Sequence, residues 1–359
     1  MFNKLKKIGF TEFNEQYFGG ALNWNTFKQW RKRKTKSNNK VKQHFIPLWF
    51  IIKLSEIFPK FTIDELEKNI IAYKGPSSSS IIVNPKFPLQ EDYRLMKIIA
   101  HFLGDGSVGG GFGSGLLKGK QHSEYRNFTP DLLDRFEEDL SVFGKVPTSK
   151  NYKHGNIILP NSIGYILQHI YKIKFDTFNS RLPVLLFFLP RKLIAAFLRA
   201  FGDDEGHVYD SSVEYYSNNK ELLRDILKLI NQKFPELKTS LIQSNHSAGK
   251  NTKFSLKFYS TSQESYLALI GFDHKQKSED LKFNMKRRRD KRRRVTESEL
   301  LRTLINKELS AKQISRLVGT RHSSVLSRLN KLNQQGEVEI VRKEHWANIW
   351  RLKNKHVKI

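Results

Sequence analysis

The chain has 359 residues, of which 38% are apolar and 12% aromatic, enough to bury a sizeable core and to exclude a disordered tail. Lysine and arginine outnumber aspartate and glutamate by 63 to 35, and the formal charge of +28 predicts a polyanionic partner, nucleic acid first. The absence of cysteine excludes disulfides and thiolate zinc sites, and no apolar run reaches the length of a membrane span. We therefore expect a cytoplasmic or nucleoid-associated protein with no membrane partner.

Residues 1–80 are predicted to form a small helical domain of the helix-turn-helix kind. The spacing of Trp24, Phe27 and Trp30 indicates one buried helical face. A breaker of glycine, proline and four serines at 75–80 marks the end of this domain. Basic side chains that point away from the buried face are candidate DNA contacts, and they are Lys28, Arg31 and Arg33.

An internal repeat fills the next two hundred residues. The stretch IIAHFLGDG at 98–106 and the stretch FLRAFGDDEG at 197–206 both run apolar residues into an acid and a glycine. Further on, PDLLDRF at 130–136 resembles KELLRDI at 220–226, and a glycine-rich insertion at 109–115 explains part of the change in offset. We predict two similar halves, 85–180 and 181–283, related by pseudo-twofold symmetry within one monomeric chain.

Small residues would bring the two acidic segments together. Ala100 with Gly104, and Ala196 with Ala200, lie at the i, i+4 spacing that lets two helices approach closely. The glycine after each acid is expected in the left-handed conformation that ends a helix. The two helices are therefore predicted to pair along a seam, with their acids together at one end.

Asp105 and Glu205 are the candidate catalytic acids and metal ligands. A carboxylate at the C-terminus of a helix faces the negative end of the helix dipole. Two such carboxylates would attract a hard divalent cation, Mg²⁺ or Mn²⁺, through their oxygens. Such ions activate water and stabilise the leaving oxygen in phosphodiester hydrolysis. The adjacent Asp203 and Asp204 are expected to serve only the helix end, and His101 is expected in the core.

Residues 284–295 are interpreted as a flexible basic linker. Eight of the nine positions in KRRRDKRRR at 286–294 are basic, and blocks of like charge repel and stay unstructured. Such a linker contacts phosphates and not base edges. The predicted phosphate contacts are Arg287, Arg288, Arg289, Arg292 and Arg293.

Residues 296–359 predict a winged helix. Capping boxes at Thr296 and Ser310 open two helices, a third follows Gly319, and the last segment alternates like two strands around a turn at 346–348. The third helix of a winged helix enters the major groove. The predicted DNA contacts are Arg321, His322, Ser324 and Arg328.

The duplicated motifs resemble those of a known enzyme family. IIAHFLGDG and FLRAFGDDEG resemble the two copies of the LAGLIDADG motif in single-chain homing endonucleases, and RLPVLLFFLPRKLIAAFLRAF resembles the approach to the second copy. This implies an α+β fold of two pseudo-symmetric αββαββα halves whose saddle-shaped antiparallel sheets lie on DNA, here flanked by a small helical domain and a winged helix. It also implies that Asp105 and Glu205 bind the metal. His101, Ala200 and Leu103 depart from the usual motif residues, and none of them is a predicted ligand.

The resemblance also implies a lysine or glutamine in each half near the scissile phosphates. NYK at 151–153 matches NTK at 251–253. Lys153 and Lys253 are therefore the symmetrical candidates, with Gln121 and Lys257 behind them.

These observations predict a metal-dependent, sequence-specific endonuclease whose partner is double-stranded DNA. Two alternatives use the same scaffold. One is a DNA-binding transcriptional regulator in which a LAGLIDADG region fused to helix-turn-helix modules has lost catalysis, and the other is an intron RNA maturase whose partner is intron RNA. An acid in both motifs favours the enzyme, because a pure binder gains nothing from carboxylates that repel phosphates.

Overall fold

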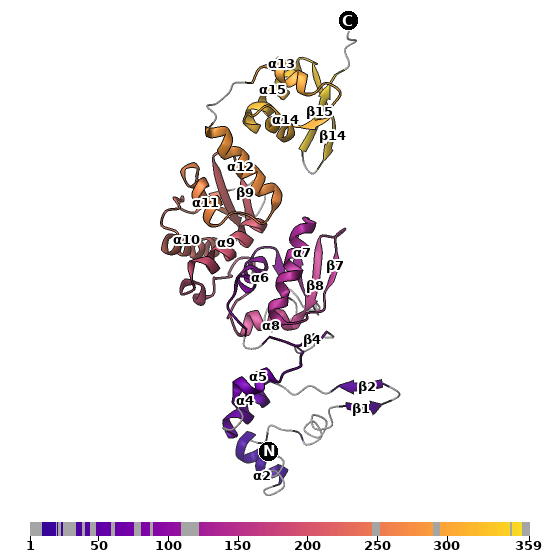
Figure 1. The fold of residues 1–359 in the computed structure, drawn as a ribbon, viewed down its shortest axis with the longest axis vertical. Helices are drawn as coiled ribbons and strands as arrows, with labels where there is room; N and C mark the ends of the chain where they lie inside the picture. The colour runs from indigo at the N-terminus through magenta and orange to yellow at the C-terminus, as the bar shows by residue number, and fades with distance from the viewer. Residues whose placement is uncertain are drawn as a thin grey trace. The chain divides into compact units, whose positions relative to one another are not determined.

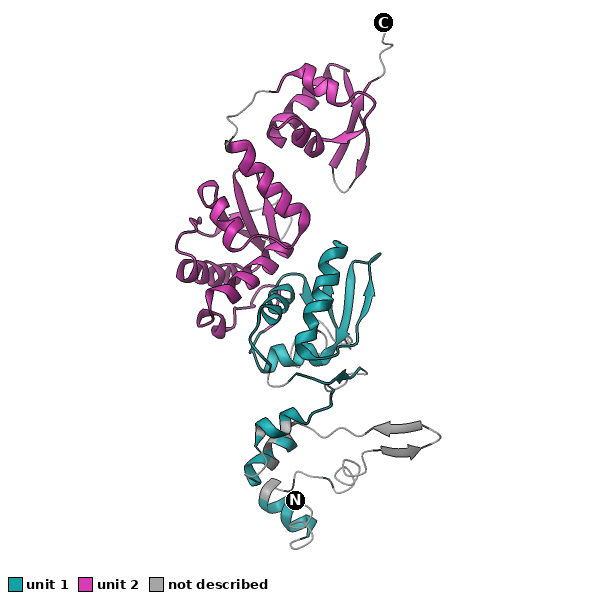
Figure 2. Ribbon diagram, in the orientation of Figure 1, with its two compact units in different colours: residues 1–173 teal, residues 174–359 magenta. Residues whose placement is uncertain are grey.

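The computed structural model separates into two compact units, residues 1–173 and residues 174–359 (Figures 1 and 2). By residue number, each unit holds one half of the repeat. The structure describes residues 9–18, 20, 23, 34–37, 40–43, 48–58, 62–74, 80–86, 89–108, 122–245, 252–289, 295–344 and 347–353. Within these ranges no helix is long and apolar enough to cross a membrane.

The N-terminal segment contains short helices and two small antiparallel sheets. Its elements are α2 (Phe10–Phe18), β1 (Lys34–Ser37), β2 (Lys40–Gln43), α4 (Leu48–Ile57), α5 (Ile63–Lys68), β3 (Ala72–Tyr73) and β4 (Ile82–Val83). Because β1 pairs with β2, the segment predicted as a helical domain also contains a short hairpin. The predicted aromatic face and DNA contacts lie outside the described residues: Trp24, Phe27, Lys28, Trp30, Arg31 and Arg33.

The rest of the first unit is a four-stranded antiparallel sheet with helices on one face. Its elements are α6 (Tyr93–Leu103), β5 (Gly106–Ser107), β6 (His122–Arg126), α7 (Pro130–Asp139), β7 (Ser149–Asn151), β8 (Asn156–Pro160) and α8 (Asn161–His169). The strand order is β5-β6-β8-β7. Tyr125 on β6 contacts His101 of α6 at 4.8 Å and Phe136 of α7 at 4.3 Å between ring centroids. His101 is therefore a core residue, as expected.

The second half has the same topology. Its elements are α9 (Arg191–Glu205), β9 (Gly206–Val208), β10 (Ser212–Ser217), α10 (Lys220–Lys233), β11 (Gln243–Asn245), β12 (Lys253–Tyr259), α11 (Gln263–Leu269) and α12 (Lys275–Arg289). The strand order β11-β12-β10-β9, read from β9, is the same as that of the first sheet. In its core, the Tyr215 hydroxyl donates to the Leu198 carbonyl of α9 and lies 2.8 Å from the Tyr266 hydroxyl of α11.

Strand register confirms the predicted repeat. Gly106 pairs with Tyr125 in the first half, and Gly206 pairs with Tyr215 in the second. The glycines are thus 100 positions apart and the tyrosines 90. The difference arises because the connection between the first two strands of each sheet is longer in the first half, where the glycine-rich insertion lies.

The C-terminal part of the second unit is a winged helix, as predicted. Its elements are α13 (Glu297–Thr303), β13 (Leu309–Ser310), α14 (Ala311–Leu317), α15 (His322–Gln334), β14 (Val338–Glu344) and β15 (Ala347–Leu352), with the sheet order β13-β15-β14. Both predicted capping boxes form, at Thr296 and Ser310. The core contains Leu300, Val325 and the fully buried Trp350. The expected turn at 346–348 is wrong for residues 347 and 348, which belong to β15, and Trp346 lies outside the described residues.

The expected flexible linker is wrong for residues 284–289, which continue α12. Asn284 donates to the Tyr209 carbonyl at 3.0 Å, and Arg288 donates to the Ser260 carbonyl at 3.1 Å. Arg287 is 8% exposed and forms an ion pair with Asp210 at 3.3 Å. These side chains therefore anchor the helix to the second half. The side chain of Arg289, and Arg292 and Arg293, lie outside the described residues.

The glycines after the two acids differ from expectation in conformation and share a different constraint. Gly206 is extended, with φ −90° and ψ 145°, and Gly106 is not among the glycines with positive φ. A Cβ on Gly106 would lie 2.5 Å from Phe102 Cα, and one on Gly206 would lie 2.3 Å from the Gly202 carbonyl oxygen. Glycine is required because each strand starts against the backbone of the helix that precedes it.

We expect Gly106→Ala and Gly206→Ala each to destabilise its own half by about 1–3 kcal/mol, the usual cost of forcing a methyl group into a filled space. The midpoint of urea unfolding measures the loss. Ser107→Ala, one residue beyond Gly106, is the control and should leave the midpoint nearly unchanged. Unchanged midpoints in both glycine variants would contradict the close packing.

Candidate active site

Asp105 and Glu205 occupy the same place in their respective halves. Asp105 lies exposed in the turn between α6 and β5, and its backbone carbonyl accepts a hydrogen bond from the Arg126 amide at 3.3 Å. Glu205 is the last residue of α9 and half-buried, directly before β9. Each acid thus stands where a helix meets the first strand of its sheet. The two acids belong to different compact units, so their meeting across a seam stays a prediction.

A cation beside Asp105 was missed by the sequence analysis. The Arg126 side chain, 66% exposed, donates from Nε and Nη2 to the two carboxylate oxygens of Glu124 at 2.8 and 3.2 Å. Asn156 donates a third hydrogen bond to Glu124, at 2.7 Å. The bonds to Glu124 raise the pKa of Arg126 and hold its guanidinium on the face of β6 opposite to Tyr125. The alternation of Glu124 and Arg126 along HSEYR is the sequence signal for this pair.

The second half carries a glutamate at the matching position with different partners. Glu124 pairs with the second residue of β5, and Glu214 pairs with the second residue of β9. Glu214 accepts hydrogen bonds from Ser212 Oγ at 2.9 Å and from the Tyr216 hydroxyl at 2.7 Å. Lys257 Nζ lies 3.6 Å from the same carboxylate. The predicted Lys257 therefore lies on the polar face of this sheet.

His207 lies beside this group, two residues after Glu205. His207 lies on β9 directly opposite Glu214 of β10. Burial lowers its pKa first, and the charges of Lys277 and Lys253 lower it further. The imidazole is therefore neutral over a wider pH range than a solvated histidine.

The other predicted basic residues do not occupy equivalent positions. Lys153 is exposed in the turn between β7 and β8, whereas Lys253 is exposed at the first position of β12. Gln121 lies outside the described residues. The catalytic roles of these residues stay predictions.

The acidic run at the end of α9 has a structural explanation. Asp203 is buried, and its carboxylate accepts from the backbone amides of Asp273 at 3.1 Å and His274 at 2.9 Å, the two residues before α12. Lys277, in the first turn of α12, donates to the carbonyls of Gly202 at 3.1 Å and Asp203 at 2.5 Å. A carboxylate thus caps the positive end of one helix, and an ammonium caps the negative end of the other. Asp203 therefore does more than serve the end of its own helix.

The predicted contacts of the winged helix lie at the start and along one side of α15. Burial lowers the pKa of Arg288 first, and the neighbouring charges of Arg287 and Arg321 lower it further. The charge of Arg321, at the start of α15, therefore acts on the end of α12. The predicted DNA contacts on α15 are His322, which is exposed, and Arg321, Ser324 and Arg328, which are half-buried.

Asp105 and Glu205 are each the kind of ligand that a hard divalent cation prefers, with phosphate and water completing the coordination. In the described part of the chain, no three His, Asp or Glu side chains gather as a cage for a metal ion. Mg²⁺ does not need such a cage, because it binds through one or two carboxylates, substrate phosphates and water. An exposed Asp105 and a half-buried Glu205, with no thiolate in the chain, match that preference.

Comparison with known proteins places a family domain on the second half. Residues 192–271 match a family model described as a LAGLIDADG-like domain, which covers α9 with Glu205 and continues beyond α11. The predicted resemblance is confirmed for this domain.

One curated relative and two solved structures illustrate further similarity. The DNA polymerase of Thermococcus kodakarensis is 23% identical over 252 residues, which is 68% of this chain but only 14% of the polymerase. The structure of I-DmoI in complex with DNA and Mn is 14% identical, with a TM-score of 0.35 over 51% of this chain and 98% of that chain. A structure of mesophilic variants of the homing endonuclease I-DmoI is 16% identical, with a TM-score of 0.34 over 50% and 95%.

Removing the Asp203 carboxylate should loosen the start of α12. Asp203→Ala should cost about 0.5–2 kcal/mol, the range for a lost helix cap. Hydrogen exchange measures it as faster exchange of the amides of residues 273 and 274. Asp204→Ala, the next residue of the same helix, should leave these amides protected. Equal protection in both variants would show that Asp203 does not hold α12.

Proposed function

We propose that this chain is a metal-dependent endonuclease that cuts double-stranded DNA at a specific sequence, in the manner of a homing endonuclease. One observation carries the proposal: the same acid–glycine junction between helix and strand occurs in both halves, at Asp105 and at Glu205. The LAGLIDADG-like domain over residues 192–271 and the charge of +28 support it.

The polar residues beside each acid have distinct tasks in this reaction. Asp105 and Glu205 would hold the divalent cation, which when bound activates water and neutralises charge on the leaving oxygen. Arg126, clamped by Glu124 through Nε and Nη2, keeps Nη1 and one hydrogen of Nη2 for a phosphate oxygen. In the second half, Lys257 and His207 can contact the opposite DNA strand.

A DNA-binding regulator without nuclease activity is the second candidate. The winged helix favours it, because this domain supplies a recognition helix without any help from the acids. The two candidates differ in cleavage and not in binding. A plasmid library incubated with the protein and Mg²⁺, and in parallel with Ca²⁺, separates them: linear products identify the endonuclease, and binding alone identifies the regulator.

Neutralising either acid should abolish cleavage. Asp105→Asn and Glu205→Gln keep the side-chain shape but remove the charge that holds a divalent cation. DNA binding should persist or tighten, because a carboxylate near the phosphates is lost. Nicking and linearisation of a supercoiled target measure the effect, with Asp204→Asn as the control that retains activity. Wild-type cutting by the Asp105 and Glu205 variants would refute this active site.

DNA affinity should fall steeply with salt. Each neutralised phosphate contributes a slope of about −0.9 to log K against log salt, so about 6–10 contacts weaken binding by about 10³–10⁵ between about 50 and 200 mM salt. Arg321→Ala should make the slope shallower by about 0.9, the contribution of one phosphate contact. Fluorescence anisotropy with a labelled duplex measures both. A flat salt dependence would contradict the nucleic-acid partner.

A further inference from the structure

Helix α12 runs from the end of the motif helix α9 to the winged helix. Its anchored side chains, Lys277, Asp280, Asn284 and Arg287, are spaced three or four residues apart and thus follow one side of the helix. Lys277 contacts α9, Asp280 contacts α14, and Asn284 and Arg287 both contact the loop after β9. The contacts at both ends and in the middle of α12 decide whether the helix can pivot.

At its N-terminus α12 is joined to the helix that carries Glu205. Asp203 accepts the two amides that precede α12, and Lys277 donates to the last carbonyls of α9. Four hydrogen bonds of opposite direction meet within one turn of each helix. The start of α12 therefore cannot shift without moving the end of α9.

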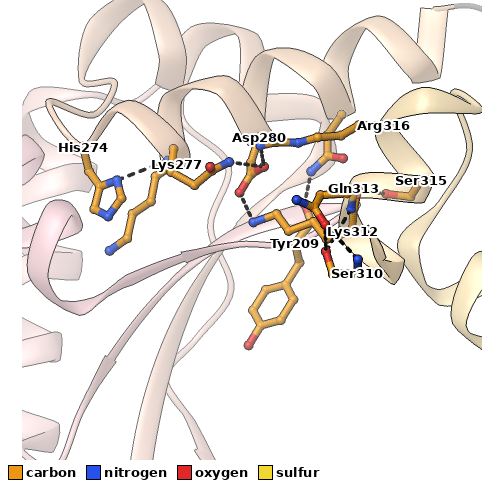
Figure 3. A network of polar contacts seen from close by, with 11 residues as sticks. Tyr209, His274, Lys277, Asp280, Ser310, Lys312, Gln313, Ser315 and Arg316 are labelled. Carbon is orange, nitrogen blue, oxygen red and sulfur yellow. Dashed lines mark hydrogen bonds and ion pairs between the residues drawn. The ribbon is translucent and has the colours of Figure 1, made fainter. Parts of the chain in front are cut away.

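One turn further along, Asp280 joins α12 to the winged helix (Figure 3). Its carboxylate accepts from Lys312 Nζ and from Arg316 Nη2, both on α14, and from Gln276 Nε2 of its own helix at 3.1 Å. The Asp280 side chain is 11% exposed, whereas Lys312 and Arg316 are 51% and 31% exposed. A nearly buried carboxylate needs such partners, because an uncompensated charge is costly away from water.

The rest of α12 is held along the second half. Asn284 bonds to the Tyr209 carbonyl, Arg287 pairs with Asp210, and Arg288 bonds to the Ser260 carbonyl. These partners belong to the loop after β9 and to the 3-10 turn that follows β12. The helix is thus fixed at its start and along its length, and the winged helix is attached to it at Asp280.

We propose that Asp280 is a positioning residue, and that through it α12 acts as a rigid strut that holds the winged helix at one fixed place relative to Glu205. The docking itself does not depend on the proposed nuclease function. The consequence for DNA rests on the proposed nuclease function. The DNA segment read by α15 then lies at a fixed distance and rotation from the cut made in the second half. Target recognition then depends on the spacing between two DNA segments as well as on their sequences.

The docking is tested first without DNA, on the full-length protein. The chain has no cysteine, so Asn231→Cys on α10 and Gln334→Cys on α15, both at exposed positions, accept a pair of spin labels at unique sites. The wild-type background should give one narrow distance distribution. Asp280→Asn, and separately Lys312→Gln with Arg316→Gln, should raise the undocked population about tenfold or more, as the loss of two partly exposed ion pairs predicts.

Two variants control for charge and for folding. Asp280→Glu keeps the charge and should retain most of the narrow distribution. Glu297→Gln removes the 2.8 Å ion pair with Lys331 inside the winged helix and should change nothing. Thermal melts of all variants should agree, since the docking contact lies outside the core of the winged helix. A broad distribution in the wild type, or a narrow one in both docking variants, would overturn the strut.

The spacing is tested by footprinting and cleavage on a target with base pairs inserted between the cut site and the segment protected by the winged helix. About five inserted base pairs rotate that segment by half a helical turn. The wild type should lose the footprint of the winged helix on this target, whereas Asp280→Asn should keep it. No cleavage of any target by the wild type would refute the nuclease but leave the strut to the distance measurement. Equal tolerance of the insertion by wild type and Asp280→Asn would refute the spacing role.

Discussion

The reciprocal capping of the end of α9 and the start of α12 is the interaction on which the second unit depends. The Asp203 carboxylate accepts hydrogen bonds from the amides before α12, and the Lys277 ammonium donates hydrogen bonds to the carbonyls that end α9. Helix ends leave amides and carbonyls without partners, and here two such ends satisfy one another through two side chains of opposite charge. This arrangement compensates the buried carboxylate of Asp203 at the end of α9. It also leaves Glu205, two residues after Asp203, directly before the start of β9.

The two halves share their backbone plan and differ in the chemistry on their polar faces. In the first half, Glu124 holds an arginine and an asparagine, whereas in the second, Glu214 holds two hydroxyls and a lysine. A carboxylate in the middle of each sheet is therefore a fixed feature, and what it organises has diverged. Under the proposed function, the two strands of a duplex would meet different groups, which suits an asymmetric target.

The sequence was sufficient to predict the parts of the fold that depend on local pattern. The duplicated acid and glycine, and the capping boxes at Thr296 and Ser310, are local signals, and the structure contains the repeat and the winged helix that they indicate. The pairing of Arg126 with Glu124 has a local signal in HSEYR, but its place beside Asp105 follows from the register of β5 and β6, which local pattern does not reveal. The basic run after residue 284 was misread, since charge density alone does not reveal that Arg287 has a partner 77 residues earlier at Asp210.

Gly202 shows why the motif would outlast the activity it suggests. A methyl group there would lie 2.9 Å from the Tyr266 hydroxyl and 3.0 Å from a ring carbon of Tyr215, both buried in the same half. Gly206 is fixed by the backbone of α9, and Asp203 by the start of α12. Three residues of FGDDEG are therefore required by the packing of this half, whatever its activity. In a lineage that abandoned cutting, these three would persist while Glu205 drifted, so a motif that survives in a distant descendant records the shape of the protein and not its chemistry.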